Sequence, residues 1–239
     1  MVTRALLVYN PGAGGRELHA EVKQAVSLLS ANGWDVEWCE TECVDDAATF
    51  AREAAALGRR VVLVAGGDGT IGRTVDGLMS AANGGSPPTL GILPCGTGNV
   101  LARQLGLPFV SIFRPHAMRE AAQIILEKRA RLVDVGRVNG RHFLCWAGVG
   151  LDAQITASVE SQPEVKRRWG QGAFFLAVVP TLRGPLGTRA LVRADGVRIS
   201  RRLVLAVVSN IRLYGGYLYI APEARMDDGL LDVCCFQGH

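Results

Sequence analysis

The sequence predicts an α/β domain with a parallel sheet, followed by an antiparallel β domain. In the first half, runs that are apolar throughout, such as Val61–Ala65, alternate with segments of helical periodicity, such as Glu17–Ser30. Apolar strands separated by helices are typical of a parallel sheet that is covered on both faces. From about Leu132 onward, short strand-like segments are joined by Asn139-Gly140 and Asp195-Gly196. These dipeptides favour two-residue hairpin turns, which only antiparallel strands can use.

Each element of the first half is placed by its own pattern. The predicted strands are the apolar runs Ala5–Tyr9, Val36–Thr41, Val61–Ala65 and Leu90–Leu93. The predicted helices carry apolar residues three or four positions apart and cover Glu17–Ser30, Asp45–Leu57, Thr70–Ala82 and a short stretch ending at Leu105. This alternating order predicts a doubly wound sheet.

The second half has shorter, strand-like segments. They are Val133–Val138, Arg141–Ala147, Arg189–Ala194, Val197–Ser200, Leu203–Ser209 and Leu231–Phe236. One helical stretch, Glu164–Val179, interrupts them. We place the domain boundary near residue 131, which gives an α/β domain over residues 1–131 and a β domain over residues 132–239.

Composition limits the classes of partner. The 239 residues are 49% hydrophobic and 20% charged, which is ordinary for a globular protein. The net charge of +4 suits an acidic small molecule or an anionic membrane surface, and it is too weak to argue for nucleic acid. No run approaches 18 apolar residues, and the six cysteines show no zinc-binding spacing, so we expect reduced and mostly buried thiols in a soluble protein.

A glycine cluster, Gly66–Thr70, lies between a predicted buried strand and a predicted helix. Ligands bind at the carboxyl ends of parallel strands, and the amino terminus of a helix offers unpaired N–H groups to phosphate. Two further loops, Asn10–Gly15 and Gly96–Asn99, follow other strands at the same edge. Together the three loops predict a phosphate cradle. The alternative is a tight turn with a helix cap at Asp68 or Thr70.

Other phosphate-binding motifs fit poorly. Gly67, Gly69 and Gly72 match the spacing of a dinucleotide-binding loop, but such a loop needs an acidic residue about 20 positions later. The chain has no acidic residue between Asp76 and Glu120. It also lacks the Gly-Lys of a Walker A loop and the nearby lysine of a protein kinase, since its only lysines are Lys23, Lys128 and Lys166. Main-chain N–H groups, hydroxyls, arginine or a metal would therefore hold the phosphates.

Five segments resemble the diacylglycerol kinase catalytic-domain family, which includes sphingosine kinases and soluble bacterial lipid kinases. In chain order they are NPGAGG (Asn10–Gly15), GGDGT (Gly66–Thr70), LPCGTGN (Leu93–Asn99), VDVGRVNGRHFLCWAGVGLDA (Val133–Ala153) and MDDGLLDV (Met226–Val233). GGDGT is shared with NAD kinases, whereas the first and last segments look like the lipid enzymes. The resemblance implies an NAD kinase/diacylglycerol kinase-like α/β domain, then a β-sandwich domain, with ATP between them.

The resemblance also implies the site residues. The ATP contacts would be Asn10, Pro11, Gly12, Ala13, Gly14, Thr41, Gly66, Gly67, Asp68, Gly69, Thr70, Ile71, Gly72 and Thr97. Asp68 would support the phosphates through water and Mg²⁺. A metal loop would use the carboxylate of Asp228 and the main-chain carbonyls of Arg225 and Leu230, oxygen ligands that suit Mg²⁺ or Ca²⁺. A simple β-turn at Asp228-Gly229 is the alternative.

The implied function is an ATP-dependent lipid kinase that moves the γ-phosphoryl of MgATP to a lipid hydroxyl. The acceptor would be diacylglycerol-like or a sphingoid base, and we expect a cytoplasmic protein in transient contact with the inner face of the membrane. A homodimer is left open. Two alternatives remain: a nucleotide-binding regulator with little or no activity on the same fold, and an NAD kinase.

Two departures from the family pattern bear on activity. Val100 stands where many members have an aspartate after the third glycine loop. Members also close with an Asp-Gly-Glu segment whose acid is assigned as the general base, and this chain contains no such segment. We therefore expect a truncated β-sandwich and a chain with little activity, because removing a general base costs about 10²–10⁴ in rate.

Several other residues are candidates for membrane contact or for structural roles only. Basic residues that could face an anionic membrane are Arg129, Arg131, Lys166, Arg167 and Arg168, with Trp169, Phe174 and Phe175 beside them; a solvated surface and core packing are the simpler explanations. Asp134 and Asp152 are interpreted as turn or network residues, and His116, His142 and His239 receive no role.

Overall fold

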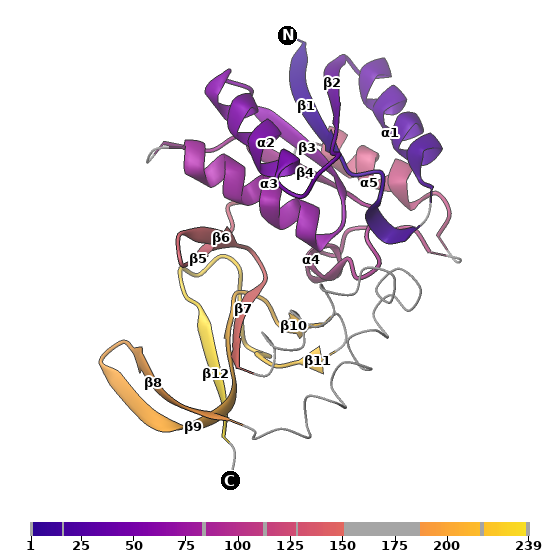
Figure 1. Ribbon diagram of the computed structural model, residues 1–239. Coiled ribbons are helices and arrows are strands. Elements are labelled where there is room, and N and C mark those ends of the chain that lie inside the picture. The colour runs from indigo at the N-terminus through magenta and orange to yellow at the C-terminus, as the bar shows by residue number, and fades with distance from the viewer. Residues whose placement is uncertain are drawn as a thin grey trace. The chain divides into compact units, whose positions relative to one another are not determined.

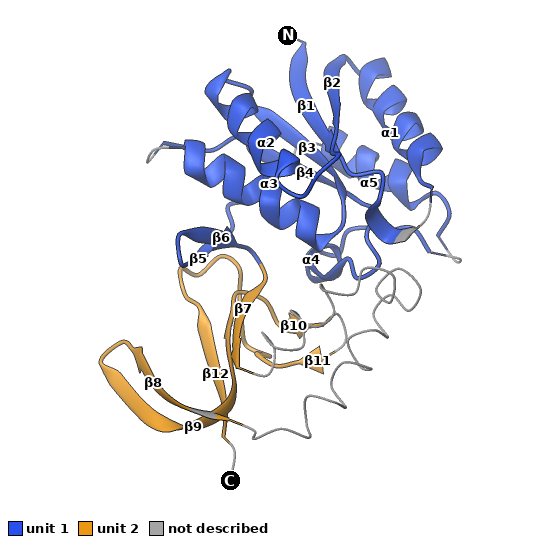
Figure 2. Cartoon of the chain, in the orientation of Figure 1, with its two compact units in different colours: residues 1–144 blue, residues 145–239 orange. Residues whose placement is uncertain are grey.

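The computed structural model describes residues 2–15, 17–82, 85–111, 114–127, 129–150, 187–215 and 218–237. The chain forms two compact units, residues 1–144 and 145–239 (Figure 2). This division falls after the hairpin of β5 (Gly136–Val138) and β6 (Arg141–Phe143), whereas the sequence pattern placed a domain boundary before it, near residue 131. That boundary remains a prediction.

The first unit is built on a parallel sheet, as predicted. Its strands lie in the order β2 (Trp34–Glu40), β1 (Thr3–Tyr9), β3 (Val61–Gly66) and β4 (Thr89–Pro94). All three pairings are parallel. The chain therefore steps outward in one direction from β1 to β2, and in the other from β3 to β4, which is the doubly wound order (Figure 1).

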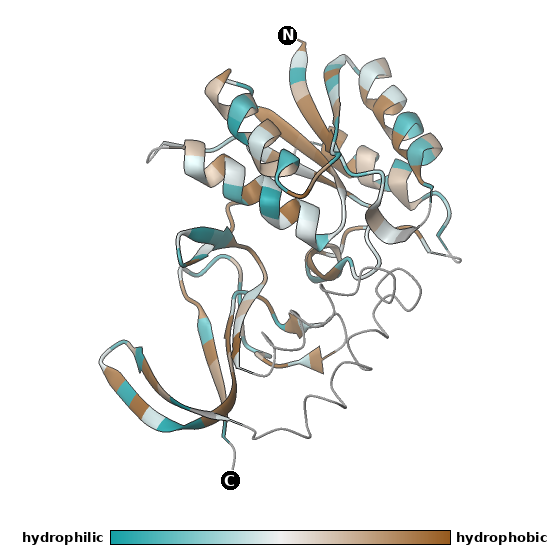
Figure 3. Ribbon diagram, viewed as in Figure 1, coloured by the Kyte–Doolittle hydropathy of each residue, from teal (hydrophilic) through white to brown (hydrophobic). Residues whose placement is uncertain are grey.

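Helices cover both faces of this sheet. Helices α1 (His19–Ala31) and α5 (Ala117–Leu126) pack on one face, and α2 (Asp46–Ala56) and α3 (Asp68–Ala81) pack on the other (Figure 1). Strand β1 alternates between the two cores, because Leu7 belongs to the α1/α5 core and Val8 to the α2/α3 core. Each such fully buried side chain contributes roughly 1.5–3 kcal/mol, so the apolar strands fix the position of the sheet (Figure 3).

Helix α5 was missed by the sequence analysis, which assigned no element between Leu105 and Leu132. The structure buries Ala117, Ala121 and their neighbours Met118 and Ala122 against α1 and β4. These residues repeat every four positions, a helical signal that the small alanine side chains made inconspicuous.

The described part of the second unit is antiparallel. Strand β9 (Val197–Ser209) pairs with β7 (Trp146–Gly150), β8 (Thr188–Ala194) and β12 (Asp232–Gln237), and a separate pair is formed by β10 (Leu213–Tyr214) and β11 (Leu218–Tyr219). The sequence analysis divided β9 into two strands. This was wrong, because the three polar residues Ser200–Arg202 continue the strand beyond its buried half.

Both predicted hairpin turns are present. Asn139 and Gly140 have φ of 49° and 83°, and Asp195 and Gly196 have φ of 47° and 80°. Two successive residues with positive φ match the twist of the flanking strands, which is why these dipeptides favour the turn. The predicted helix Glu164–Val179 lies outside the described residues. Among the described helices, none has the length and apolar character needed to cross a bilayer.

Candidate phosphate-binding site

The loops that follow the four parallel strands meet at one edge of the first unit. The strand register places Tyr9 beside both Glu40 and Ala65, and Gly66 beside Pro94, so the strands end at the same level. The loops that leave this edge are Asn10–Gly15, the segment at Thr41, Gly66–Gly67 and Cys95–Asn99. The structure thus brings together the predicted ATP contacts of the first unit.

The main chains of the three glycine loops pack closely against one another. A Cβ on Gly14 would lie 2.2 Å from the carbonyl oxygen of Cys95, and one on Gly96 would lie 2.5 Å from Cα of Gly67. Gly14 also has φ of 74°, which favours glycine. At these positions glycine is needed because another loop lies there, and not because a ligand does.

Gly69 is different. It is exposed in the first turn of α3, and a Cβ built there meets no atom within 4 Å. The N-cap residue of α3 is Gly67, which carries no side chain to cap the helix, and no side chain among the described residues accepts an N–H of its first turn. A helix end without a cap presents N–H groups to whatever lies in front of it. This end of α3 is therefore a candidate anion site among the three glycine loops.

Asn10 ties the first loop to α3. Its Nδ2 donates to Oγ1 of Thr70 at 2.9 Å, and its Oδ1 accepts from the main-chain N–H of Gly12 at 3.0 Å. Its own N–H donates to the carbonyl of Ala65 at 2.9 Å. Because the buried Thr70 hydroxyl accepts from Asn10, its proton is directed toward a different acceptor.

Asp68 makes hydrogen bonds to the segment after the third loop that the sequence did not predict. Its two carboxylate oxygens accept the main-chain N–H groups of Val100 and Leu101, at 3.0 Å each. These groups open helix α4 (Val100–Leu105), so Asp68 caps α4 from the first turn of α3. The helix that follows the third loop therefore has its amino terminus occupied, in contrast to α3.

The third loop is closed internally by Asn99. Its Oδ1 accepts from the N–H of Gly96 at 2.9 Å, and its Nδ2 donates to the carbonyl of the same residue at 2.7 Å. Asn99 is 3% exposed and has φ of 47°. Thr97 is exposed at the loop tip, and Thr41 is held beside the first loop through its N–H, which donates to the carbonyl of Tyr9 at 2.8 Å.

The third loop contains a buried cysteine, Cys95, whose thiol has a raised pKa. Burial, and to a smaller extent the carboxylate of Glu21, raises the pKa of the Cys95 thiol to about 12. The thiol therefore stays protonated at neutral pH, which makes it a poor nucleophile. The expectation that most cysteines are buried was wrong: of the six, Cys95 is buried, Cys43 is exposed and the others are partly exposed.

The predicted metal loop lies in the second unit. There Oδ1 of Asp228 accepts the N–H of Leu230 at 3.1 Å, and Gly229 has φ of 75°, as in a tight turn. The guanidinium of Arg225 contacts Asp227 at 3.3 Å. In the described part of the chain, no group of three or more His, Cys, Asp or Glu is arranged to hold a metal. The metal site therefore remains a prediction.

One paired histidine escaped the sequence analysis. Oδ1 of Asp76, on α3, accepts from both the main-chain N–H and the ring Nδ1 of His142, at 2.9 Å each. This pair holds the β5–β6 hairpin against α3. No local pattern could reveal it, because the two residues are 66 positions apart.

Comparison with known proteins gives a consistent result. Residues 4–138 match the family model "Diacylglycerol kinase catalytic domain", and residues 146–238 match "YegS C-terminal NAD kinase beta sandwich-like domain". The chain is 33% identical over 230 residues to a diacylglycerol kinase of Bacillus subtilis, covering 96% of this chain and 72% of that protein. It is 31% identical to a Pseudomonas fluorescens protein named "Probable lipid kinase YegS-like", with the same coverage.

A solved structure agrees with this result. A diacylglycerol kinase from Bacillus anthracis matches with a TM-score of 0.75 and 31% identity, covering 98% of this chain and 74% of that one. The parallel α/β domain followed by an antiparallel β-sandwich is thus an architecture that this chain shares with a class of lipid kinases. The chain belongs to the diacylglycerol kinase catalytic-domain family.

Proposed function

We propose that the chain binds MgATP at the amino terminus of α3 and transfers its γ-phosphoryl group to the hydroxyl of a lipid such as diacylglycerol. The observation that carries this proposal is the open helix end at Gly67–Gly69, surrounded by glycine loops that hold one another rigidly. Phosphoryl transfer depends mainly on positioning and on neutralising charge, and prearranged N–H groups supply both.

The residues divide the work of holding the nucleotide. The N–H groups of the first turn of α3 bind phosphate oxygens, and the hydroxyl of Thr70, which accepts from Asn10, donates its proton to another phosphate oxygen. Asn10 keeps that hydroxyl in place through the 2.9 Å bond from its Nδ2. Gly12–Gly14, Thr41, Ile71, Gly72 and Thr97 complete the rim of the site. None of these contacts requires a lysine.

Mg²⁺ fits this site as a companion of the nucleotide. Each carboxylate oxygen of Asp68 accepts one N–H and has a further lone pair, which can hold a water molecule of a hydrated cation. Mg²⁺ prefers oxygen ligands, keeps several waters and is commonly held by one or two carboxylates with substrate phosphates. When bound, it would neutralise charge that develops on the transferred phosphoryl group.

A labelling assay tests the proposal. The protein is incubated with γ-labelled ATP, Mg²⁺ and diacylglycerol in mixed micelles, and in parallel with NAD. We expect label in the lipid, at a rate above that of a sample without protein and reduced in Asn10→Ala. Label transferred to NAD would contradict the proposal, and bound nucleotide without a product from any lipid alcohol would favour the regulator.

A further inference from the structure

The outer half of β9 and the whole of β8 form a two-stranded ribbon in the second unit. Strands β7 and β12 pair with β9 over Leu203–Ser209, whereas β8 pairs with it over Val197–Leu203. The ribbon, residues 188–203, therefore extends past the part of the sheet that other described strands flank (Figure 1). The first six residues of β9 are all exposed.

The register of the ribbon places arginines directly opposite one another. Arg189 faces Arg202 across the two strands, and Arg193 faces Arg198. Like charges in directly opposed positions destabilise an antiparallel pair. None of the four forms an ion pair with a residue in the described ranges, and Asp195, in the turn, is the only acidic residue in the ribbon sequence. Within the described residues, the four arginines thus face one another without a paired carboxylate.

Apolar side chains accompany the arginines. Leu191 lies between the two arginine pairs on the same face and is 45% exposed. The opposite face carries Val192, Val197 and Ile199, of which Val197 is 59% exposed. Figure 3 shows apolar and polar positions alternating along this hairpin. A partner that binds the arginine face must therefore accept both positive charge and the aliphatic side chain of Leu191.

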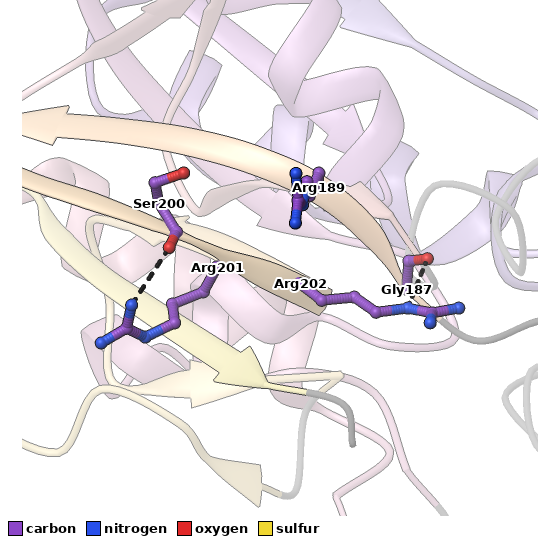
Figure 4. Close-up of a pocket in the computed structure, with 5 residues that line it drawn as sticks. All are labelled: Gly187, Arg189, Ser200, Arg201 and Arg202. Carbon is purple, nitrogen blue, oxygen red and sulfur yellow. Dashed lines mark hydrogen bonds between the residues drawn. The ribbon is translucent and has the colours of Figure 1, made fainter.

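The base of the ribbon is hollowed. An open recess of about 730 Å³ is lined by Gly187, Arg189, Ser200, Arg201 and Arg202 (Figure 4). The guanidinium of Arg202 donates to the carbonyl of Gly187, and that of Arg201 to the carbonyl of Ser200, at 3.3 Å each. Each of these bonds uses one of five N–H donors, so the guanidinium groups keep donors for phosphate oxygens.

We propose that the ribbon is a docking surface for anionic phospholipid headgroups at a membrane surface. A bilayer supplies both chemistries on one face of the ribbon, since phosphates meet the arginines and the acyl boundary meets Leu191, which lies between them. A second copy of this chain would place two arginine faces together and add repulsion. Nucleic acid offers phosphates but no acyl boundary. This docking surface rests on the proposed lipid kinase function in one respect: a kinase with a lipid acceptor has to reach a membrane.

Vesicle sedimentation tests the proposal with matched pairs of variants. The ribbon pair is Arg193→Gln with Arg198→Gln, and the control pair is Arg52→Gln with Arg119→Gln, exposed arginines on helices of the first unit. Both pairs remove the same charge. A basic residue near an anionic surface contributes about fivefold to binding, so the ribbon pair should weaken partitioning to phosphatidylglycerol/phosphatidylcholine vesicles about 30-fold. The control pair should change it less than about threefold.

The dependence of binding on salt, its dependence on lipid composition and the melting temperature of the ribbon pair provide three further measurements. Binding of the unaltered protein should fall as salt rises and should be weak on pure phosphatidylcholine, because screening and neutral headgroups both remove the attraction. The ribbon pair should melt no lower than the unaltered protein, since it removes a like-charge contact. If it does melt lower, Arg189→Gln with Arg202→Gln at the other end of the ribbon gives the same test.

Equal loss in the ribbon and control pairs, or no preference for anionic vesicles, would overturn the proposal. So would binding of a DNA duplex that depends on Arg193 and Arg198 while vesicles are ignored. Calorimetry with MgATP is run on the same variants, and all should bind nucleotide equally. A protein that binds vesicles through the ribbon but no nucleotide would refute the kinase proposal and leave the docking surface standing.

Discussion

The side chain of Asp68 links two of the glycine loops through hydrogen bonds from the start of α4. Both of its oxygens accept N–H groups of α4, so it joins the second glycine loop to the third. Any contact with a hydrated cation uses the lone pairs that remain. The acid of the GGDGT segment therefore has a structural task that its position in the sequence does not reveal.

Replacing Asp68 by Asn should lower stability by about 1–2 kcal/mol. The amide oxygen can accept one of the two N–H groups, but the NH₂ group cannot accept the other, and the favourable charge at the start of α4 is lost. Chemical denaturation measures the effect. Asp35→Asn is the control, because Asp35 forms an exposed ion pair with Arg4 at 3.8 Å, worth little in water. Equal small effects in both variants would show that the cap is unimportant.

The Asp76–His142 pair predicts a specific dependence on pH. Burial opposes ionisation of Asp76, but hydrogen bonds from His142 outweigh it and hold the pKa of the carboxyl below its ordinary value of 3.8. Between the lowered pKa of the folded protein and the ordinary value of 3.8, the folded protein therefore binds fewer protons at Asp76 than the unfolded chain does. The stabilisation is complete above pH 3.8 and is lost as the pH falls through the folded-state pKa.

Denaturant midpoints of the unaltered protein and Asp76→Asn, measured from pH 7 down to the acid limit, check this expectation. The gap between the two should be constant near neutrality and should narrow below pH 3.8. A gap that does not change with pH would mean that the carboxylate form of Asp76 has no special role.

At the scale of elements, two glycines of helix α3 have different surroundings. Its amino terminus is open at Gly69, where a Cβ would meet no atom within 4 Å. Further along, a Cβ on Gly77 would lie 2.2 Å from the carbonyl oxygen of Ala48 on α2. The close approach of α2 and α3 therefore depends on Gly77 and sets the direction in which the amino terminus of α3 points.

Gly77→Ala should destabilise the first unit by about 1–3 kcal/mol, because the obstacle is main chain and the helices must separate. Gly72→Ala, in open space on the same helix, should be neutral or should stabilise by up to about 1 kcal/mol. Thermal and chemical denaturation of the two variants provide a matched comparison. If Gly77→Ala were as stable as Gly72→Ala, the close helix contact would be absent in solution.

The elements that the sequence predicted well have strong local signals. The run Val61–Ala65 is short, rich in β-branched residues and followed by glycines, which favours a buried strand, and Asn139-Gly140 adopts the hairpin turn at low cost. Helix α5 was missed because alanines dominate its buried face. The contact of Gly14 with Cys95 and the Asp76–His142 pair depend on where distant segments meet. A single sequence carries no local record of such contacts.

For the whole molecule, the site follows from the parallel order of the sheet. Four strands that end at one level place four loops side by side, and main-chain contacts between glycines leave one helix end open among them. The positions of the predicted ATP contacts in the first unit were therefore accessible from the sequence. The arginine ribbon of the second unit was not, because its opposed charges become visible only with the strand register.

In the proposed site, main-chain N–H groups at α3 hold polyphosphate without help from lysine. The chain has three lysines, Lys23, Lys128 and Lys166. The most direct test is a calorimetric titration of MgATP into a variant with all three changed to glutamine. We predict a dissociation constant within about threefold of that of the unaltered protein, whereas loss of a lysine that grips phosphate would weaken binding at least about tenfold, or 1.4 kcal/mol. A tenfold loss in this folded variant would contradict the account.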